Sequence, residues 1–253
     1  MASSRIVLVT GGNNGIGYET HILLGSRSVG KGKAAIDSLK RECPDSRNEV
    51  DLLRVDVTSD TSIEKAFEQV KTNPGHIDTL INNAGATFDI EYLRGNVSLR
   101  ESFTKAYDVN VAGANVMTHT FMPLLLKSTD PRLIFVAGLA NINRTGKAYF
   151  PTPPQPAGWP KKVDFETIGY KCSKLALSML MLDWNHKMKE DGVKVWSVGP
   201  GFLATDLGNM REKAEEMGCG HASEGGAMLR SVVEGKRDAD VGKIVVKDGI
   251  SEW

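Results

Sequence analysis

Two side chains that could move a proton lie four positions apart, Tyr170 and Lys174. Residues 168–189 are predicted to form a helix, and a spacing of four places both side chains on one helix face. A free phenol has a pKa of about 10, which is too high for easy proton release near neutral pH. A neighbouring lysine charge favours the phenolate. The pair therefore predicts a tyrosine acid/base, with an ordinary surface contact as the alternative interpretation.

A glycine-rich turn directly follows the first predicted strand, an apolar run at residues 5–10. The turn reads Thr10-Gly11-Gly12-Asn13-Asn14-Gly15-Ile16-Gly17. Glycines permit a tight turn and close approach to a pyrophosphate, and a helix beginning there would offer unpaired N–H groups to the phosphates. A structural turn would also explain these glycines, but their place after a buried strand favours a dinucleotide site.

The elements that must position these residues alternate between strands and helices. Further strands are predicted at 21–25, 52–57, 77–81, 132–136, 193–198 and 243–246, and helices at 31–41, at 60–72 after an N-cap at Ser59, and on both sides of Asn110 within 99–126. This alternation is typical of a parallel sheet with helices on both faces. We therefore expect a Rossmann-like, doubly wound α/β fold in one domain, residues 1–253.

Four elements, in the family's order, resemble the short-chain dehydrogenase/reductase family. They are the spacing of Gly11, Gly15 and Gly17, the run Asn82-Asn83-Ala84-Gly85, the Tyr170/Lys174 pair, and Pro200-Gly201 with Thr205. The resemblance spans about the whole chain, and the chain is similar to fungal carbonyl-reductase-like members. It implies an oxidoreductase in which a nicotinamide cofactor carries the hydride.

The resemblance also implies roles for individual residues. Tyr170 and Lys174 are expected to be catalytic together with Asn110, which supports Lys174 through a proton-relay water. Lys174 is also expected to hydrogen-bond the nicotinamide ribose, and Asp56 to contact the adenine. The expected cofactor-binding residues are Gly11, Gly15, Ile16, Gly17, Arg27, Asp56, Asn83, Tyr170, Lys174, Pro200 and Thr205.

Arg27 follows the second predicted strand. In families of this kind an acidic residue at that place binds the ribose 2′-hydroxyl and selects NAD. A guanidinium suits the 2′-phosphate of NADP through paired charge-assisted hydrogen bonds. We therefore expect NADP, with NAD less favoured and a solvated surface arginine as the alternative interpretation.

The chain departs from the family pattern at the end of the fifth predicted strand. The family places a serine there to hold the substrate carbonyl, but Ala137, Gly138 and Ala140 carry no hydroxyl, and the next one along is Thr145. Losing one such donor typically costs about 10²–10³ in rate. Tyr170 could still donate to the oxygen, so we expect weakened rather than absent activity.

A larger departure is the short connection between the first two strands. Only ten residues separate Thr10 from His21, whereas a parallel crossover with its helix needs about a dozen or more. We expect the first crossover helix to be truncated, the apolar face of the sheet beneath it to be bare, and dinucleotide binding to be weak. The join indicates an excised segment, from an altered splice or gene model.

A proline-rich insert separates the fifth strand from the Tyr170 helix. It carries Tyr149, Phe150 and Trp159 and five prolines between Pro151 and Pro160. It resembles the insert of monomeric carbonyl-reductase-like members beside the active-site helix, although a surface loop would explain it equally well. We expect a monomer rather than a homo-oligomer.

Composition excludes several classes of partner. The 31 basic and 31 acidic residues give zero formal net charge, which argues against nucleic acid and anionic membranes. The three cysteines, Cys43, Cys172 and Cys219, form no disulfide pattern, and Cys219 with His221 lacks the second pair that a zinc site needs, so no metal is expected. The N-terminus lacks a signal peptide, no apolar run is long enough for a membrane helix, and a cytoplasmic location is expected.

Two functions remain open. The first is an NADP-dependent oxidoreductase that interconverts a carbonyl and an alcohol on a small, largely apolar metabolite, by analogy in a secondary-metabolite pathway. The second is a non-catalytic or weakly active dinucleotide-binding relic. The missing serine and crossover helix favour the relic, whereas Tyr170, Lys174 and Asn110 favour the enzyme.

Overall fold

The computed structural model describes residues 5–11, 20–137, 142–149 and 153–253. The described strands form one sheet in the order β3-β2-β1-β4-β5-β6-β7-β8, and neighbours run parallel except β7 and β8. The strands are β1 (Arg5–Thr10), β2 (Thr20–Ser26), β3 (Glu49–Arg54), β4 (Thr79–Asn82), β5 (Arg132–Val136), β6 (Lys194–Val198), β7 (Ile244–Val246) and β8 (Gly249–Ser251). The Rossmann-like, doubly wound prediction is confirmed.

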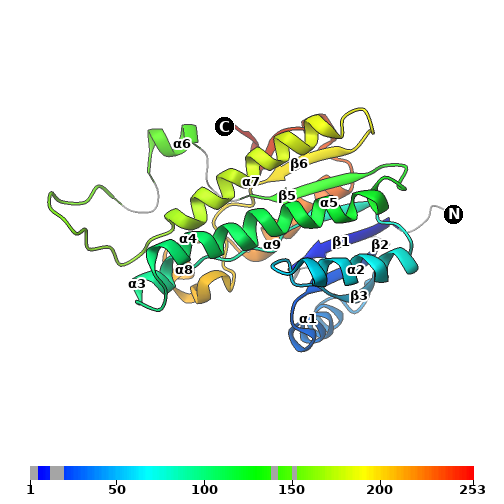
Figure 1. Ribbon diagram of the computed structural model, residues 1–253, viewed down its shortest axis with the longest axis horizontal. Coiled ribbons are helices and arrows are strands. Elements are labelled where there is room, and N and C mark those ends of the chain that lie inside the picture. The colour runs from blue at the N-terminus through cyan, green and yellow to red at the C-terminus, as the bar shows by residue number, and fades with distance from the viewer. Residues whose placement is uncertain (1–4, 12–19, 138–141, 150–152) are drawn as a thin grey trace.

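The described helices are α1 (Val29–Glu42), α2 (Asp60–Thr72), α3 (Asp89–Leu93), α4 (Leu99–Tyr107), α5 (Gly113–Leu125), α6 (Ile142–Lys147), α7 (Ile168–Lys187), α8 (Arg211–Glu216) and α9 (Ala222–Val233). The longer helices α1, α2, α5, α7 and α9 lie on the two faces of this sheet, whereas α6 lies away from it (Figure 1). A π-helical turn at Asp108–Ala112 joins α4 to α5, and short 3-10 turns lie at Leu207–Asn209 and Asp238–Asp240.

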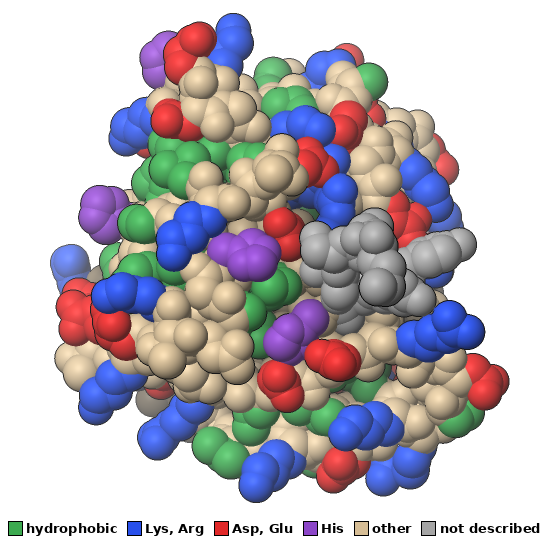
Figure 2. Space-filling model, turned by 90° about the vertical axis from the view of Figure 1, so that its right-hand side faces the viewer, with side chains coloured by type: hydrophobic (Ala, Val, Ile, Leu, Met, Phe, Trp, Pro, Cys, Tyr) green, Lys and Arg blue, Asp and Glu red, His purple; other side chains and the backbone are tan. Residues whose placement is uncertain are grey.

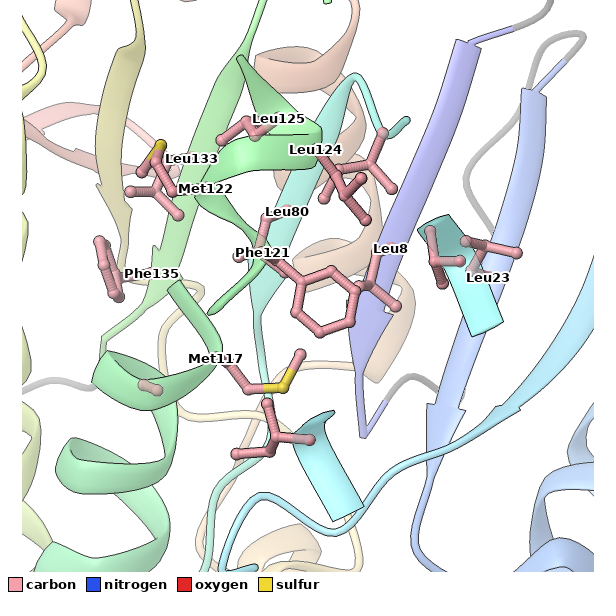
Figure 3. Packing of buried hydrophobic residues seen from close by; sticks show 14 of the residues in the cluster. Leu8, Leu23, Leu80, Met117, Phe121, Met122, Leu124, Leu125, Leu133 and Phe135 are labelled. Atoms are coloured by element: carbon pink, nitrogen blue, oxygen red, sulfur yellow. The ribbon is translucent and has the colours of Figure 1, made fainter. Parts of the chain in front are cut away.

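One face of the sheet packs under α2, α5 and α7. Phe121 of α5 lies beside Leu8 of β1 and Leu80 of β4 (Figure 3), and its ring meets the Phe67 ring of α2 edge-on at 5.7 Å. Leu8, Leu80 and Phe121 are fully buried. At about 25 cal/mol per Å² of buried apolar surface, this layer is a major source of the fold's stability.

The opposite face is covered by α9 and α1. Val232 and Val233 of α9 pack in one cluster with Val7, Val9 and Ile22. Gly32 of α1 comes so close to β3 that a Cβ on it would overlap the Leu52 side chain. Helices therefore hold both faces of the sheet, as the alternation of elements predicts.

The expectation that a face near the short crossover is bare is wrong for the described strands. Val7, Val9, Ile22 and Leu24 are between 0% and 8% exposed, because α9 shares their cluster and α1 packs over β2 and β3. Strands β1 and β2 are parallel neighbours with Arg5 opposite Thr20. The expected truncation itself falls on residues 12–19, which lie outside the described residues.

Local signals explain several helix boundaries. Ser59 caps α2 as predicted, accepting from the Ser62 amide, and Ser98 with Glu101 forms a capping box at the start of α4. Two strand predictions were shifted: the third strand is Glu49–Arg54 rather than 52–57, and the fourth is Thr79–Asn82 rather than 77–81. Pairing with β2 fixes the third strand, because His21 lies opposite Glu49 and Ser26 opposite Arg54.

The side of the surface that Figure 2 shows carries no large patch of like-charged side chains. There, Lys and Arg side chains are interspersed with Asp and Glu, as the balanced composition leads one to expect. No helix in the described part of the chain is long and apolar enough to span a membrane.

Candidate active site

Tyr170 and Lys174 lie in the first turns of α7, one turn apart. The Lys174 side chain is 3% exposed, its Nζ lies 5.6 Å from the centre of the Tyr170 ring, and it donates to the Val136 carbonyl at the end of β5 at 2.8 Å. The predicted shared face is therefore present. It is turned toward the carboxyl edge of the sheet.

Burial dominates the ionisation of both groups. It raises the pKa of Tyr170 to about 12 and lowers the pKa of Lys174 to about 8. The expectation that the lysine charge favours the phenolate is thus outweighed, because a low-dielectric surrounding penalises each charged form. Tyr170 therefore keeps its proton at neutral pH.

Asn110 lies in the π-helical turn between α4 and α5 and is completely buried. Its Oδ1 accepts from the Ala86 amide at 2.8 Å, and its Nδ2 donates to the Ala86 carbonyl at 2.9 Å and to Ser173 Oγ at 2.8 Å. Ser173 in turn donates to the Tyr170 carbonyl at 2.7 Å. Asn110 therefore connects the loop after β4 to the helix that carries Tyr170.

Gly85 lies where the side chains of Lys174 and Asn110 come together. A Cβ on Gly85 would lie 3.2 Å from Lys174 Nζ and 3.4 Å from Asn110 Oδ1. The absence of a side chain leaves room for both polar groups. Lys174 and Asn110, predicted from separate parts of the sequence, are brought together here, and the Tyr170 ring centre lies 5.6 Å from the same Lys174 Nζ.

The start of the glycine-rich turn is fixed by the loop after β4. Thr10 Oγ1 accepts from the amides of Asn83 and Ala84, both at 3.0 Å, and Asn83 Nδ2 donates to the carbonyls of Thr10 and Gly11. Gly11 has φ +61°, and a Cβ there would lie 3.0 Å from the Ala84 Cα. Gly15, Ile16 and Gly17 of the same prediction lie outside the described residues.

Arg27 and Asp56 lie after the carboxyl ends of β2 and β3, on the same edge as Gly11 and Asn83. Arg27 is exposed, and within the described residues its guanidinium has no hydrogen-bonded or ion-paired partner. Asp56 Oδ1 accepts from the Thr58 amide and hydroxyl. The Arg27 side chain therefore lies exposed on the same edge of the sheet as Gly11 and Asn83.

Pro200 and Thr205 follow β6 on this edge. Gly201 has φ +90°, and the chain turns there into the loop that follows the strand. Thr205 Oγ1 accepts a long hydrogen bond of 3.4 Å from the Leu207 amide. A Cβ on Gly208 would lie 2.7 Å from the Thr87 side chain, so this segment closes over the loop after β4.

The position after β5 is apolar and enclosed. Ala137 is 2% exposed and donates its amide to the Val198 carbonyl at 2.9 Å. Gly138, Leu139 and Ala140 lie outside the described residues. The described end of β5 thus presents a methyl group beside the carbonyl that Lys174 binds.

Part of the insert contacts the Tyr170 helix. Tyr149 is half exposed, and its ring lies 4.3 Å from Lys171 Nζ. Trp159 is 88% exposed. The Asn143 amide of α6 donates to the Trp253 carbonyl at 3.0 Å, which ties the insert to the C-terminal end of the described chain.

Sequence reasoning missed two residues around this site. Ser173 joins Asn110 to the Tyr170 backbone, and Asp89 binds the amides of Gly169 and Tyr170 at 2.8 and 2.9 Å. Both contacts join segments distant in sequence, so no local pattern indicates them. His221, considered beside Cys219 for a metal, instead caps α9 by accepting from the Ser223 amide.

Comparison with known proteins identifies the family. A model of the short chain dehydrogenase family matches residues 5–149. The chain is 44% identical to the short-chain dehydrogenase/reductase tropE of Talaromyces stipitatus over 268 residues and 37% identical to the short-chain dehydrogenase/reductase eupG of a Phoma species over 271. Each alignment covers 98% of this chain and 97% of the relative. This chain belongs to the short-chain dehydrogenase/reductase family of oxidoreductases.

Solved structures share the fold. NADPH-bound carbonyl reductase from chicken fatty liver matches with a TM-score of 0.72 at 22% identity, covering 99% of both chains. The 3-oxoacyl-[acyl-carrier protein] reductase from Brucella melitensis, in complex with NAD, matches with a TM-score of 0.74 at 20% identity, covering 97% of this chain and 96% of that one.

Proposed function

We propose that the chain is an NADP-dependent oxidoreductase that interconverts a carbonyl and an alcohol on a small, largely apolar metabolite, in a secondary-metabolite pathway. The observation that carries this proposal is the grouping of three residues at the carboxyl edge of the sheet: Lys174 and Asn110 meet at Gly85, and the Tyr170 ring lies beside Lys174. Ligands of open α/β sheets bind at this edge where the strand order reverses, here between β1 and β4.

The residues present fit a dinucleotide. Gly11 and Gly85 carry no side chain at the edge where the strand order reverses, and the exposed Arg27 guanidinium suits a 2′-phosphate. We infer that Gly11, Asn83, Asp56, Pro200 and Thr205 line the dinucleotide. Gly15, Ile16 and Gly17 complete the proposed phosphate turn.

The chemistry divides between the dinucleotide and the chain. When bound, the nicotinamide supplies the hydride. Tyr170 donates its Oη proton to the carbonyl oxygen in reduction, a role suited to its raised pKa. Lys174 holds a positive charge near that oxygen, and Asn110 keeps the loop after β4 against α7.

The experiment that tests this function is NADPH oxidation in the presence of a panel of aldehydes and ketones of increasing apolar size. We expect saturable turnover with at least one apolar carbonyl. Tight NADPH binding without turnover on any carbonyl would support the relic instead.

Cofactor choice is tested by Arg27→Asp. The change replaces a phosphate partner with a like charge, so we expect the Kd for NADPH to rise about tenfold or more while the Kd for NADH changes little. Lys33→Asp, in α1, makes the same charge change at another exposed position and serves as the control. Equal effects of Arg27→Asp on both cofactors would show that this residue does not bind the 2′-phosphate.

The apolar end of β5 is tested by Ala137→Ser. A hydroxyl there would donate to charge that develops on the substrate oxygen, and we expect kcat to rise by up to about 10²-fold. Ala137→Cys adds a similar volume with a weak donor and is the control. An unchanged kcat in the folded serine variant would mean that another group already holds the oxygen.

A further inference from the structure

The start of α7 obtains its hydrogen-bond partners from two acidic side chains. The Thr167 side chain makes no capping bond. Glu166 Oε1 accepts from the amides of Thr167 and Ile168 at 2.7 and 3.0 Å, and Asp89 Oδ1 and Oδ2 accept from the amides of Gly169 and Tyr170 at 2.8 and 2.9 Å. The N–H groups that a helix start leaves unpaired are therefore shared between a neighbour in sequence and a residue 80 positions away.

These hydrogen bonds offset the free-energy cost of burying the Asp89 side chain. The residue is 2% exposed, and among the described residues no Lys, Arg or His side chain forms an ion pair with it. Asp89 Oδ2 also accepts a hydrogen bond from the Thr87 hydroxyl, with an oxygen–oxygen distance of 3.0 Å. A buried carboxylate needs several donors, and here two backbone N–H groups at a helix N-terminus supply most of them.

Gly169 makes the approach of the carboxylate possible. A Cβ on Gly169 would lie 2.9 Å from Asp89 Oδ1, closer than real Cβ contacts allow. Any other residue at this position would push the carboxylate away from the backbone just before Tyr170. The glycine and the aspartate therefore form one matched contact.

Asp89 also ties α7 to the loop that holds the glycine-rich turn. It is the first residue of α3 and follows the run from Asn82 to Gly85. Asn110 joins Ala86 of this loop to Ser173, and Asp89 joins its end to Gly169 and Tyr170. The loop is thus held against α7 at two points, the amides of Gly169 and Tyr170 and the hydroxyl of Ser173.

We propose that Asp89 is a positioning residue, which fixes the first turn of α7 and so places the Tyr170 hydroxyl relative to the substrate and the nicotinamide. The inference rests on the function proposed above. Because a misplacement of about 1 Å can cost on the order of 10² in rate, loss of this contact should act on the chemical step.

The test compares Asp89→Ala, Asp89→Asn and Gly169→Ala with Glu166→Ala as the matched control. Glu166→Ala removes two bonds from the same helix start but none from Tyr170. We expect Asp89→Ala to lower kcat about 10- to 100-fold with the Kd for NADPH within twofold. Asp89→Asn, which keeps one acceptor, and Gly169→Ala should show intermediate losses, and Glu166→Ala should keep kcat within about twofold.

Two results would overturn the positioning role. One is an Asp89→Ala protein with wild-type kcat. The other is an equal loss of kcat in Glu166→Ala, which would indicate general weakening of the helix start.

A measurement that needs no enzymatic activity separates this inference from the proposed function. Hydrogen exchange at the amides of Gly169 and Tyr170 should accelerate at least tenfold in Asp89→Asn but not in Glu166→Ala. A wild-type protein inactive on every carbonyl would refute the proposed function while this measurement still reports on Asp89. Unchanged exchange at both amides would refute the contact itself.

Discussion

Tyr170→Phe is expected to reduce carbonyl turnover by about 10²–10⁴-fold, the range that positioned general acids contribute. The change removes only the hydroxyl, which is the proposed proton donor, and leaves the ring beside Lys174 in place. The Kd for NADPH should remain within a few-fold, because the other residues proposed to bind the dinucleotide are untouched. Steady-state turnover and a binding titration on the same preparation measure both quantities.

A matched control is Tyr149→Phe, which removes a phenol hydroxyl from the insert beside the same helix. It should keep wild-type kcat. Wild-type turnover in Tyr170→Phe would remove Tyr170 from the mechanism, and a loss in Tyr149→Phe would move the proton donor into the insert.

Lys174→Met is expected to abolish turnover yet stabilise the protein at pH 7. Burial lowers the pKa of Lys174 from 10.5 to about 8, so between these values the unfolded chain binds more protons than the folded chain. The free energy of unfolding should therefore rise with pH through this window, and the cost of the buried charge is fully present below pH 8. Removing the buried charge should raise the free energy of unfolding by about 3 kcal/mol, the equivalent of this pKa shift. Losing the hydrogen bond to the Val136 carbonyl should lower it by about 1 kcal/mol.

Melting temperatures of wild type and Lys174→Met at pH 7 and pH 10 measure this effect. The variant should melt higher at pH 7, and the difference should shrink or reverse at pH 10. Lys187→Met, at an exposed position of the same helix, should show neither change. A variant that is equally destabilised at both pH values would mean that Lys174 carries no burial cost.

Local sequence patterns were sufficient to predict features that depend on residues close together in the chain. The apolar run of β1 predicted a strand buried on both faces, and the spacing of Tyr170 and Lys174 predicted their shared face. Ser59 marked the start of α2. These features depend on neighbours in the sequence, which is why the sequence alone could predict them.

Other features depend on contacts between distant segments. The π-helical turn at Asn110 inserts into a continuous helical run, and the 3.6-residue period gives no sign of it. Helix α9 contains Gly225 and Gly226, which weaken its helical signal, yet a Cβ on Gly225 would lie 2.9 Å from the Leu203 side chain. The bonds from Asp89 to α7 span 80 residues and leave no periodic trace.

The most direct test of the account is hydride transfer from NADPH deuterated at the transferred position. The wild-type protein, given the best carbonyl of the panel, should yield an alcohol that carries one deuterium per NADPH oxidised, and Tyr170→Phe should yield almost none. Saturable NADPH binding with no deuterated alcohol from any carbonyl would contradict the account.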